Sequence, residues 1–142
     1  MICFFDSSAL AKRYVEEAGT AMVLDLIDRA ESVSASRLTW VEITSAVARL
    51  VPSDRTAVRD DIIRALDDDF SVLVNILEAT PSVMADARKA VLRHQLRTAD
   101  AIQLASAMTA MSWYGKDVRF VCAGKKLLAA AITEQMEVVE PV

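Results

Sequence analysis

The chain has 142 residues, of which 54% are hydrophobic and 25% are charged, a composition typical of a folded globular protein. This length suits one domain with a sizeable core, so we expect a single domain over residues 1–142. Sixteen basic and twenty acidic residues give a net charge of −4. That balance argues against a protein that coats nucleic acid nonspecifically.

The sequence predicts neither a membrane segment nor a secretion signal. Charged residues interrupt every apolar stretch before it reaches the length of a membrane-spanning helix. The N-terminus lacks a basic segment followed by a long apolar run, because Asp6 comes too early. We therefore expect a cytoplasmic protein. Cys3 and Cys122 both lie in apolar, strand-like runs, which predicts buried reduced thiols rather than a zinc site.

The apolar residues predict strands that alternate with helices along the chain. The predicted strands cover residues 2–5, 33–35, 72–77, 118–122 and 137–139. The predicted helices cover residues 7–15, 20–31, 38–50, 53–70, 81–95, 98–112 and 124–132. Strands separated by helical segments favour an α/β fold, in which helices cover both faces of a parallel sheet.

Three acidic residues stand where such a sheet gathers its strand-to-helix loops. Asp6 directly follows the first strand, Glu42 lies in the first turn of its helix, and Asp100 lies at another helix start. These loops share one edge of a parallel sheet, so carboxylates distant in sequence can meet there. Clustered carboxylates repel one another unless a cation lies among them, and hard divalent cations prefer oxygen ligands. The three acids therefore point to Mg²⁺ or Mn²⁺ and to phosphate chemistry.

Each acid also has a purely structural explanation. Asp6 could cap the helix that follows it, and Thr39 with Glu42 matches the capping-box spacing. Thr98 could cap the next helix, where Asp100 in the first turn is favoured by the helix dipole. Against this, Glu42 and Asp100 lie in strongly apolar helices, where an unpaired carboxylate is costly. A shared cation would offset that cost.

Residues beside the acids are candidate substrate ligands. Ser7 and Ser8 follow the first acid, and their hydroxyls could bind a phosphate or a metal-bound water, or cap the helix. Arg97 is the candidate phosphate-binding cation because it lies three residues before Asp100. The run of three aspartates at 67–69 is interpreted as a solvated helix end.

Four segments in this order, FFDSSALAKRYVEE, SRLTWVEITSAVARL, LRTADAIQLASA and FVCAGKKLLAAA, resemble the PIN-domain family, specifically VapC-type toxins of bacterial toxin–antitoxin pairs. The resemblance implies a three-layer α/β/α fold with a mostly parallel sheet of four to five strands. It also implies a Mg²⁺- or Mn²⁺-dependent endoribonuclease, often a homodimer, that a cognate antitoxin silences. The family's three acids match Asp6, Glu42 and Asp100, and its hydroxyl matches Ser7 or Ser8.

The fourth family motif departs from the pattern. Many relatives read F-V-[TS]-x-D-[KR]-x-L, whereas FVCAGKKL places Cys122 at the hydroxyl position and Gly124 at the acidic one. Asp117 precedes its strand and is expected at the opposite sheet edge, and Glu134 and Glu137 follow the next helix. Three acids with waters can still hold Mg²⁺, which normally keeps several waters.

Three functional hypotheses follow. The leading one is metal-assisted hydrolysis of RNA phosphodiester bonds at Asp6, Glu42 and Asp100. The alternative, motivated by Gly124, is a catalytically impaired PIN-fold protein that acts through antitoxin or RNA binding. A receiver-like domain is a third class, disfavoured because no Asp follows the predicted third strand. Apolar residues of helices 20–31 and 38–70 serve core packing, and some could line a groove for an antitoxin helix.

Overall fold

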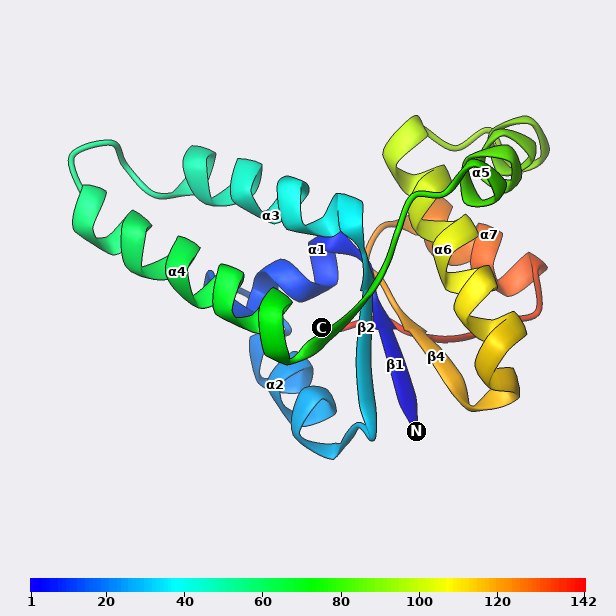
Figure 1. Cartoon of the computed structure of the whole chain (residues 1–142), viewed down its shortest axis with the longest axis horizontal. Helices are drawn as coiled ribbons and strands as arrows, with labels where there is room; N and C mark the ends of the chain where they lie inside the picture. Colours follow the sequence, from blue (N-terminus) through cyan, green and yellow to red (C-terminus); the bar gives the residue numbers. More distant parts are fainter.

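One sheet of five strands organises the computed structural model, which describes residues 1–142 (Figure 1). All strands are parallel and lie in the order β3-β2-β1-β4-β5. Their bounds are β1 (Ile2–Phe5), β2 (Ser32–Ser36), β3 (Val74–Leu77), β4 (Val118–Val121) and β5 (Glu137–Val139). Because every strand runs the same way, all five carboxyl ends lie at one edge of the sheet.

Helices cover both faces of the sheet, which confirms the predicted three layers (Figure 1). One face carries α1 (Ser7–Leu10), the short 3₁₀ turn η1 (Ala11–Arg13), α2 (Thr20–Arg29), α3 (Arg37–Leu50) and α4 (Thr56–Val72). The other carries α5 (Pro81–His94), α6 (Thr98–Tyr114), the 3₁₀ turn η2 (Gly115–Asp117) and α7 (Lys125–Thr133). No helix is both long and apolar enough to cross a bilayer.

The sheet separates two parts of the core. The central strand β1 contributes to both, because successive side chains of a strand point to opposite faces. Phe4 joins the α5–α7 side, where its ring packs edge-on against Phe120 at 5.9 Å between centroids. Phe5 joins the α1–α4 side. The middle of helix α6 is enclosed, and its residues from Ala101 to Ala107 are all buried. The polar side chains of Gln103 and Ser106 are therefore placed inside the protein.

The predicted element boundaries hold to within a few residues. The helix predicted at 7–15 ends its α-helical part at Leu10, and the strand predicted at 72–77 begins at Val74 because α4 continues to Val72. Cys3 and Cys122 are buried free thiols, as predicted.

Asp67 and Asp68 are exposed near the end of α4, as the interpretation of residues 67–69 as a solvated helix end predicts, but Asp67 and Asp69 also bond other elements. Trp40 Nε1 donates to Asp67 at 2.8 Å. Asp69 accepts from Arg13 Nε at 2.8 Å and from the Tyr14 hydroxyl at 2.7 Å. These bonds tie α4 to α3 and to the η1 segment.

Candidate metal-binding site

Asp6 lies one residue beyond β1 and is 3% exposed. Its backbone N–H donates to the Val121 carbonyl at 3.0 Å, which continues the β1–β4 ladder past the strand end. Its carboxylate accepts from the Ala9 N–H at 2.8 Å and from the Ser8 hydroxyl at 2.9 Å. Asp6 therefore caps α1, and its carboxylate is deeply buried at the same time.

Burial raises the pKa of Asp6 to about 7, and the nearby Asp100 carboxylate acts in the same direction. The hydrogen bonds from Ala9 and Ser8 lower that pKa but do not outweigh burial. No Lys, Arg or His forms an ion pair with Asp6. A buried carboxylate beside a like charge is an arrangement that a bound cation stabilises.

Glu42 lies in the second turn of α3, so its predicted place in the first turn is wrong, as is the capping box with Thr39. The reason is that the Ser36 hydroxyl accepts from the Leu38 N–H at 3.1 Å, which starts the helix earlier. Glu42 Oε1 instead accepts from the Ser7 hydroxyl at 2.6 Å and from Gln103 Nε2 at 3.1 Å.

Asp100 lies in the first turn of α6, as predicted. Arg97, not Thr98, is the residue that precedes the helix, and it makes no side-chain capping bond. Burial raises the pKa of Asp100, the Glu42 carboxylate raises it further, and Arg97 opposes both effects. Arg97 is exposed, forms no ion pair and lies near Asp100. The electrostatic links from Asp6 to Asp100 and from Asp100 to Glu42 place the three acids in one region.

The donors in this region fit Mg²⁺ or Mn²⁺ in their chemistry. They are carboxylate oxygens, and burial, together with repulsion from a neighbouring carboxylate, raises the pKa values of Asp6 and Asp100. No three His, Cys, Asp or Glu side chains lie close enough together to coordinate one ion as they stand. Mg²⁺ commonly binds through one or two carboxylates and several waters, so ligation by Asp6 and Asp100, with Glu42 through water, remains compatible.

The remaining predicted site residues fall into two groups. The hydroxyls of Ser7 and Ser8 are already engaged, since Ser7 donates to Glu42 and Ser8 to Asp6. Arg97 is available to a substrate because nothing binds its guanidinium. Three other arginines are paired with acids, namely Arg13 with Asp69, Arg37 with Glu78 and Arg93 with Glu134.

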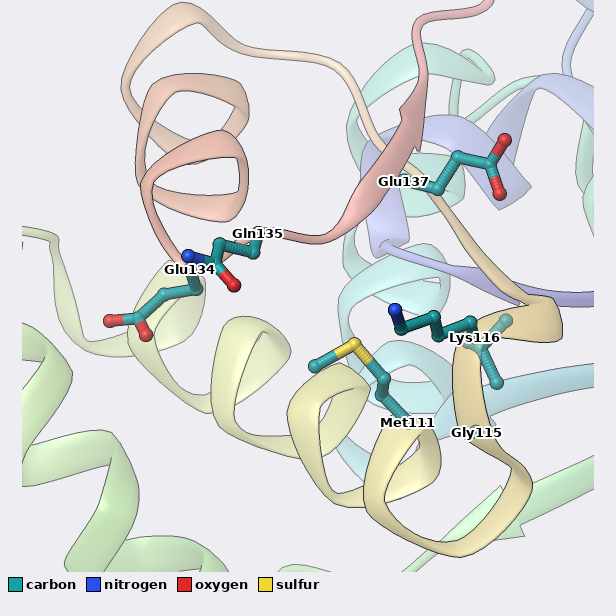
Figure 2. A pocket seen from close by; sticks show the side chains of 7 residues that line it. Met111, Gly115, Lys116, Glu134, Gln135 and Glu137 are labelled. Atoms are coloured by element: carbon teal, nitrogen blue, oxygen red, sulfur yellow. The ribbon is translucent and has the colours of Figure 1, made fainter.

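No carboxylate occupies the fourth family position. Gly124 precedes α7 and has φ +110°, a backbone conformation that side-chain-bearing residues rarely adopt. Asp117 lies at the opposite edge of the sheet, where it pairs with the N-terminal amine at 3.2 Å. Glu134 and Glu137 line a pocket of about 500 Å³ at that same distant edge, between the end of α6 and the start of β5 (Figure 2).

Three polar residues at the sheet edge that carries the acids were not predicted to belong to the site. Thr39 and Gln103 form hydrogen bonds with Ser7, and Gln103 also bonds Glu42. The signal for Gln103 was its place in the apolar run AIQLA. Glu140 follows β5 directly, and with Asp6 and Asp100 it helps burial to raise the pKa of Cys122. The rule that selected Asp6, an acid just after a strand, would also have found Glu140.

Comparison with known proteins places the chain in a family. The PIN domain model matches residues 3–111. Ribonuclease VapC45 and Ribonuclease VapC49, from two strains of Mycobacterium tuberculosis, are each 30% identical over 109 residues, which cover 75% of this chain and 75% of each relative. The chain therefore belongs to the PIN-domain family, as the sequence motifs predicted, and these two relatives are of the VapC type.

Solved structures share the whole fold. A toxin–antitoxin complex from Klebsiella pneumoniae has a TM-score of 0.69 at 17% identity, and FitAcB from Neisseria gonorrhoeae has 0.70 at 19% identity. Each alignment covers 99% of this chain and 98% of the other. At these identities the likeness shows the fold alone, and it agrees with the α/β/α architecture.

Proposed function

We propose that this protein is a Mg²⁺- or Mn²⁺-dependent endoribonuclease, the toxin of a toxin–antitoxin pair. The observation that carries the proposal is the buried Asp6 carboxylate, which has Asp100 as a like-charged neighbour and no cationic partner. Membership of the PIN-domain family and the ribonuclease names of its relatives support the choice of RNA as substrate.

In this proposal Asp6, Glu42 and Asp100 hold the metal directly or through water. A bound divalent ion polarises a phosphoryl oxygen and lowers the pKa of water. Asp100 or Glu42 orients the attacking water. Ser8 and Ser7 hold Asp6 and Glu42 in place. Arg97 then contacts a substrate phosphate beside Asp100.

The test is cleavage of RNA by the purified chain with Mg²⁺ or Mn²⁺, scored by the new ends it creates. We expect Asp6→Asn and Asp100→Asn each to lower the rate by roughly 100-fold or more, because each removes a ligand charge. Asp54→Asn is the matched control, since Asp54 is exposed and lies in the loop between α3 and α4. Cleavage that persists in EDTA, or in both site variants, contradicts the assignment.

A second candidate function is a PIN fold that has lost catalysis and acts through antitoxin or RNA binding. Gly124 favours it, because the position that carries an acid in many relatives has no side chain. This candidate predicts a wild-type chain that is inert at every Mg²⁺ and Mn²⁺ concentration and still binds its partner tightly.

The proposed antitoxin site lies on the hairpin of α3 and α4, which projects from the sheet (Figure 1). Large apolar side chains are exposed there, including Val41, Leu50, Val58 and Val72. Such a surface suits an amphipathic helix of a partner. Amides of α3 and α4 should be protected from hydrogen exchange in the complex with the co-purified antitoxin, and unchanged exchange there counts against this placement. The proposal also includes a homodimer, which light scattering of the purified chain tests.

A further inference from the structure

Three uncharged residues, each within three positions of one of the acids in the sequence, form hydrogen bonds with one another inside the protein. Ser7 follows Asp6, Thr39 lies three residues before Glu42, and Gln103 lies three residues after Asp100. Gln103 Nε2 is 2.8 Å from Ser7 Oγ and 2.8 Å from Thr39 Oγ1, and the two hydroxyl oxygens are 3.1 Å apart. We call these residues the Ser7–Thr39–Gln103 cluster. It joins α1, α3 and α6, the three helices that carry or follow the acids.

Stability alone does not explain the amide in this cluster. Gln103 is 2% exposed and lies among the buried apolar residues of α6. Its Oε1 has no hydrogen-bond partner, although Nε2 has three acceptors within reach. A buried polar group with unmet bonds costs free energy, and an apolar side chain of similar volume would avoid that cost.

The Glu42 carboxylate is what the cluster holds. Ser7 donates to its Oε1 at 2.6 Å and Gln103 donates to the same oxygen at 3.1 Å. Oε2 makes no hydrogen bond with the protein, so one oxygen is fixed and the other is free to take a metal or a metal-bound water. Hydrogen bonds from residues that do not themselves touch the metal orient metal-binding carboxylates in this way.

We propose that Ser7, Thr39 and Gln103 are positioning residues, which fix the Glu42 carboxylate relative to Asp6 and Asp100 for divalent-metal binding. The proposal rests on the proposed metal-dependent function. It assigns Ser7 to the support of Glu42 and gives Thr39 and Gln103 a function in the site. Loss of a residue that hydrogen-bonds a metal ligand typically weakens metal affinity or activity by about 10–100-fold.

Binding of Mn²⁺ to the full chain, measured by titration calorimetry after removal of metal with EDTA, tests this directly. Gln103→Met keeps the length and removes the amide, and Thr39→Val keeps the shape and removes the hydroxyl. We expect each to weaken the Kd for Mn²⁺ by about 10–100-fold. Thr39→Ser restores the hydroxyl and should bind Mn²⁺ nearly as the wild type does. In RNA cleavage, kcat should fall at limiting Mn²⁺ and recover at saturating Mn²⁺.

Ser106→Ala is the matched control. Ser106 lies three residues beyond Gln103 on α6, is 0% exposed, and has a hydroxyl with no partner. Its removal should leave Mn²⁺ affinity unchanged. Thermal unfolding shows whether each variant is folded, and the pair Thr39→Val and Thr39→Ser keeps the test decisive if Gln103→Met does not fold.

Three outcomes overturn the inference, and they differ from one another. Wild-type affinity in both Gln103→Met and Thr39→Val removes the positioning role while leaving the proposed function intact. An equal loss in Ser106→Ala identifies a general disturbance of the core. A wild-type chain that neither binds Mn²⁺ nor cleaves RNA refutes the proposed function, and the positioning role is refuted with it.

Discussion

Asp6→Asn separates the energetic cost of the buried carboxylate from its proposed function. Burial raises the pKa of Asp6 from an ordinary 3.8 to about 7. A carboxyl group with a raised folded-state pKa holds its proton more tightly in the folded chain. Its contribution to stability is therefore fully favourable below the unfolded-state pKa and is lost as the pH rises from 3.8 through 7. Above both values the loss amounts to about 4 kcal/mol.

Asparagine removes this titration and keeps the helix cap. Asn caps a helix about as well as Asp, so its side-chain oxygen can still accept from the Ala9 N–H. After a cost of about 1 kcal/mol for a lost hydrogen bond, we expect Asp6→Asn to exceed the metal-free wild type by about 3 kcal/mol at pH 8. At pH 5 the two chains should be nearly equal, since most of the wild-type loss falls above that pH.

The assay is urea unfolding in EDTA from pH 5 to pH 8, with Asp54→Asn as the exposed control. Wild type and control should lose about 3 kcal/mol across this range relative to Asp6→Asn. Parallel curves for wild type and Asp6→Asn would show that burial does not raise the pKa of Asp6, and the main physical argument for a cation there would fail. Added Mn²⁺ should narrow the difference at pH 8 by stabilising the wild type.

Substitutions at two further positions test other parts of the structure. Gly124→Asp and Gly124→Ala should each lower the free energy of unfolding by about 1–3 kcal/mol, because φ +110° strains any side-chain-bearing residue. Urea unfolding measures this, and a more stable variant would contradict it. Asp69→Ala should cost about 1–3 kcal/mol, because it leaves Arg13 and the Tyr14 hydroxyl without their acceptor. Asp68→Ala is its control, and an equal loss there would refute the assigned role of Asp69.

The fold and the edge that carries the acids could be predicted from local patterns. The apolar run ICFF predicts the first strand, and Asp6 directly after it predicts an acid in the following loop. In a parallel sheet such loops lie at the carboxyl edge, so the chain order also predicts where this acid lies. The start of α3 was misjudged because Ser36 and Thr39 are both good capping residues, and only the fold shows which one meets a free N–H.

Local sequence patterns could not predict the hydrogen bonds around the acids. Ser7, Thr39 and Gln103 are 96 residues apart at their extremes. No periodicity links them, and only the packing of α1, α3 and α6 brings their polar atoms into contact. The partners of Asp67 and Asp69 were missed for the same reason, since they lie on α3 and in the η1 segment, far away in sequence.

The position of β1 at the centre of the sheet has a consequence for synthesis of the chain. Strand β1 is synthesised well before one of its two neighbours, β4 (Val118–Val121). The bond that fixes the Asp6 backbone, to the Val121 carbonyl, therefore cannot form until β4 has been synthesised. Pairing between such distant segments is also slow. For a protein proposed to cut RNA, this order of assembly means that the site around Asp6 stays incomplete until β4 has been made and has paired with β1.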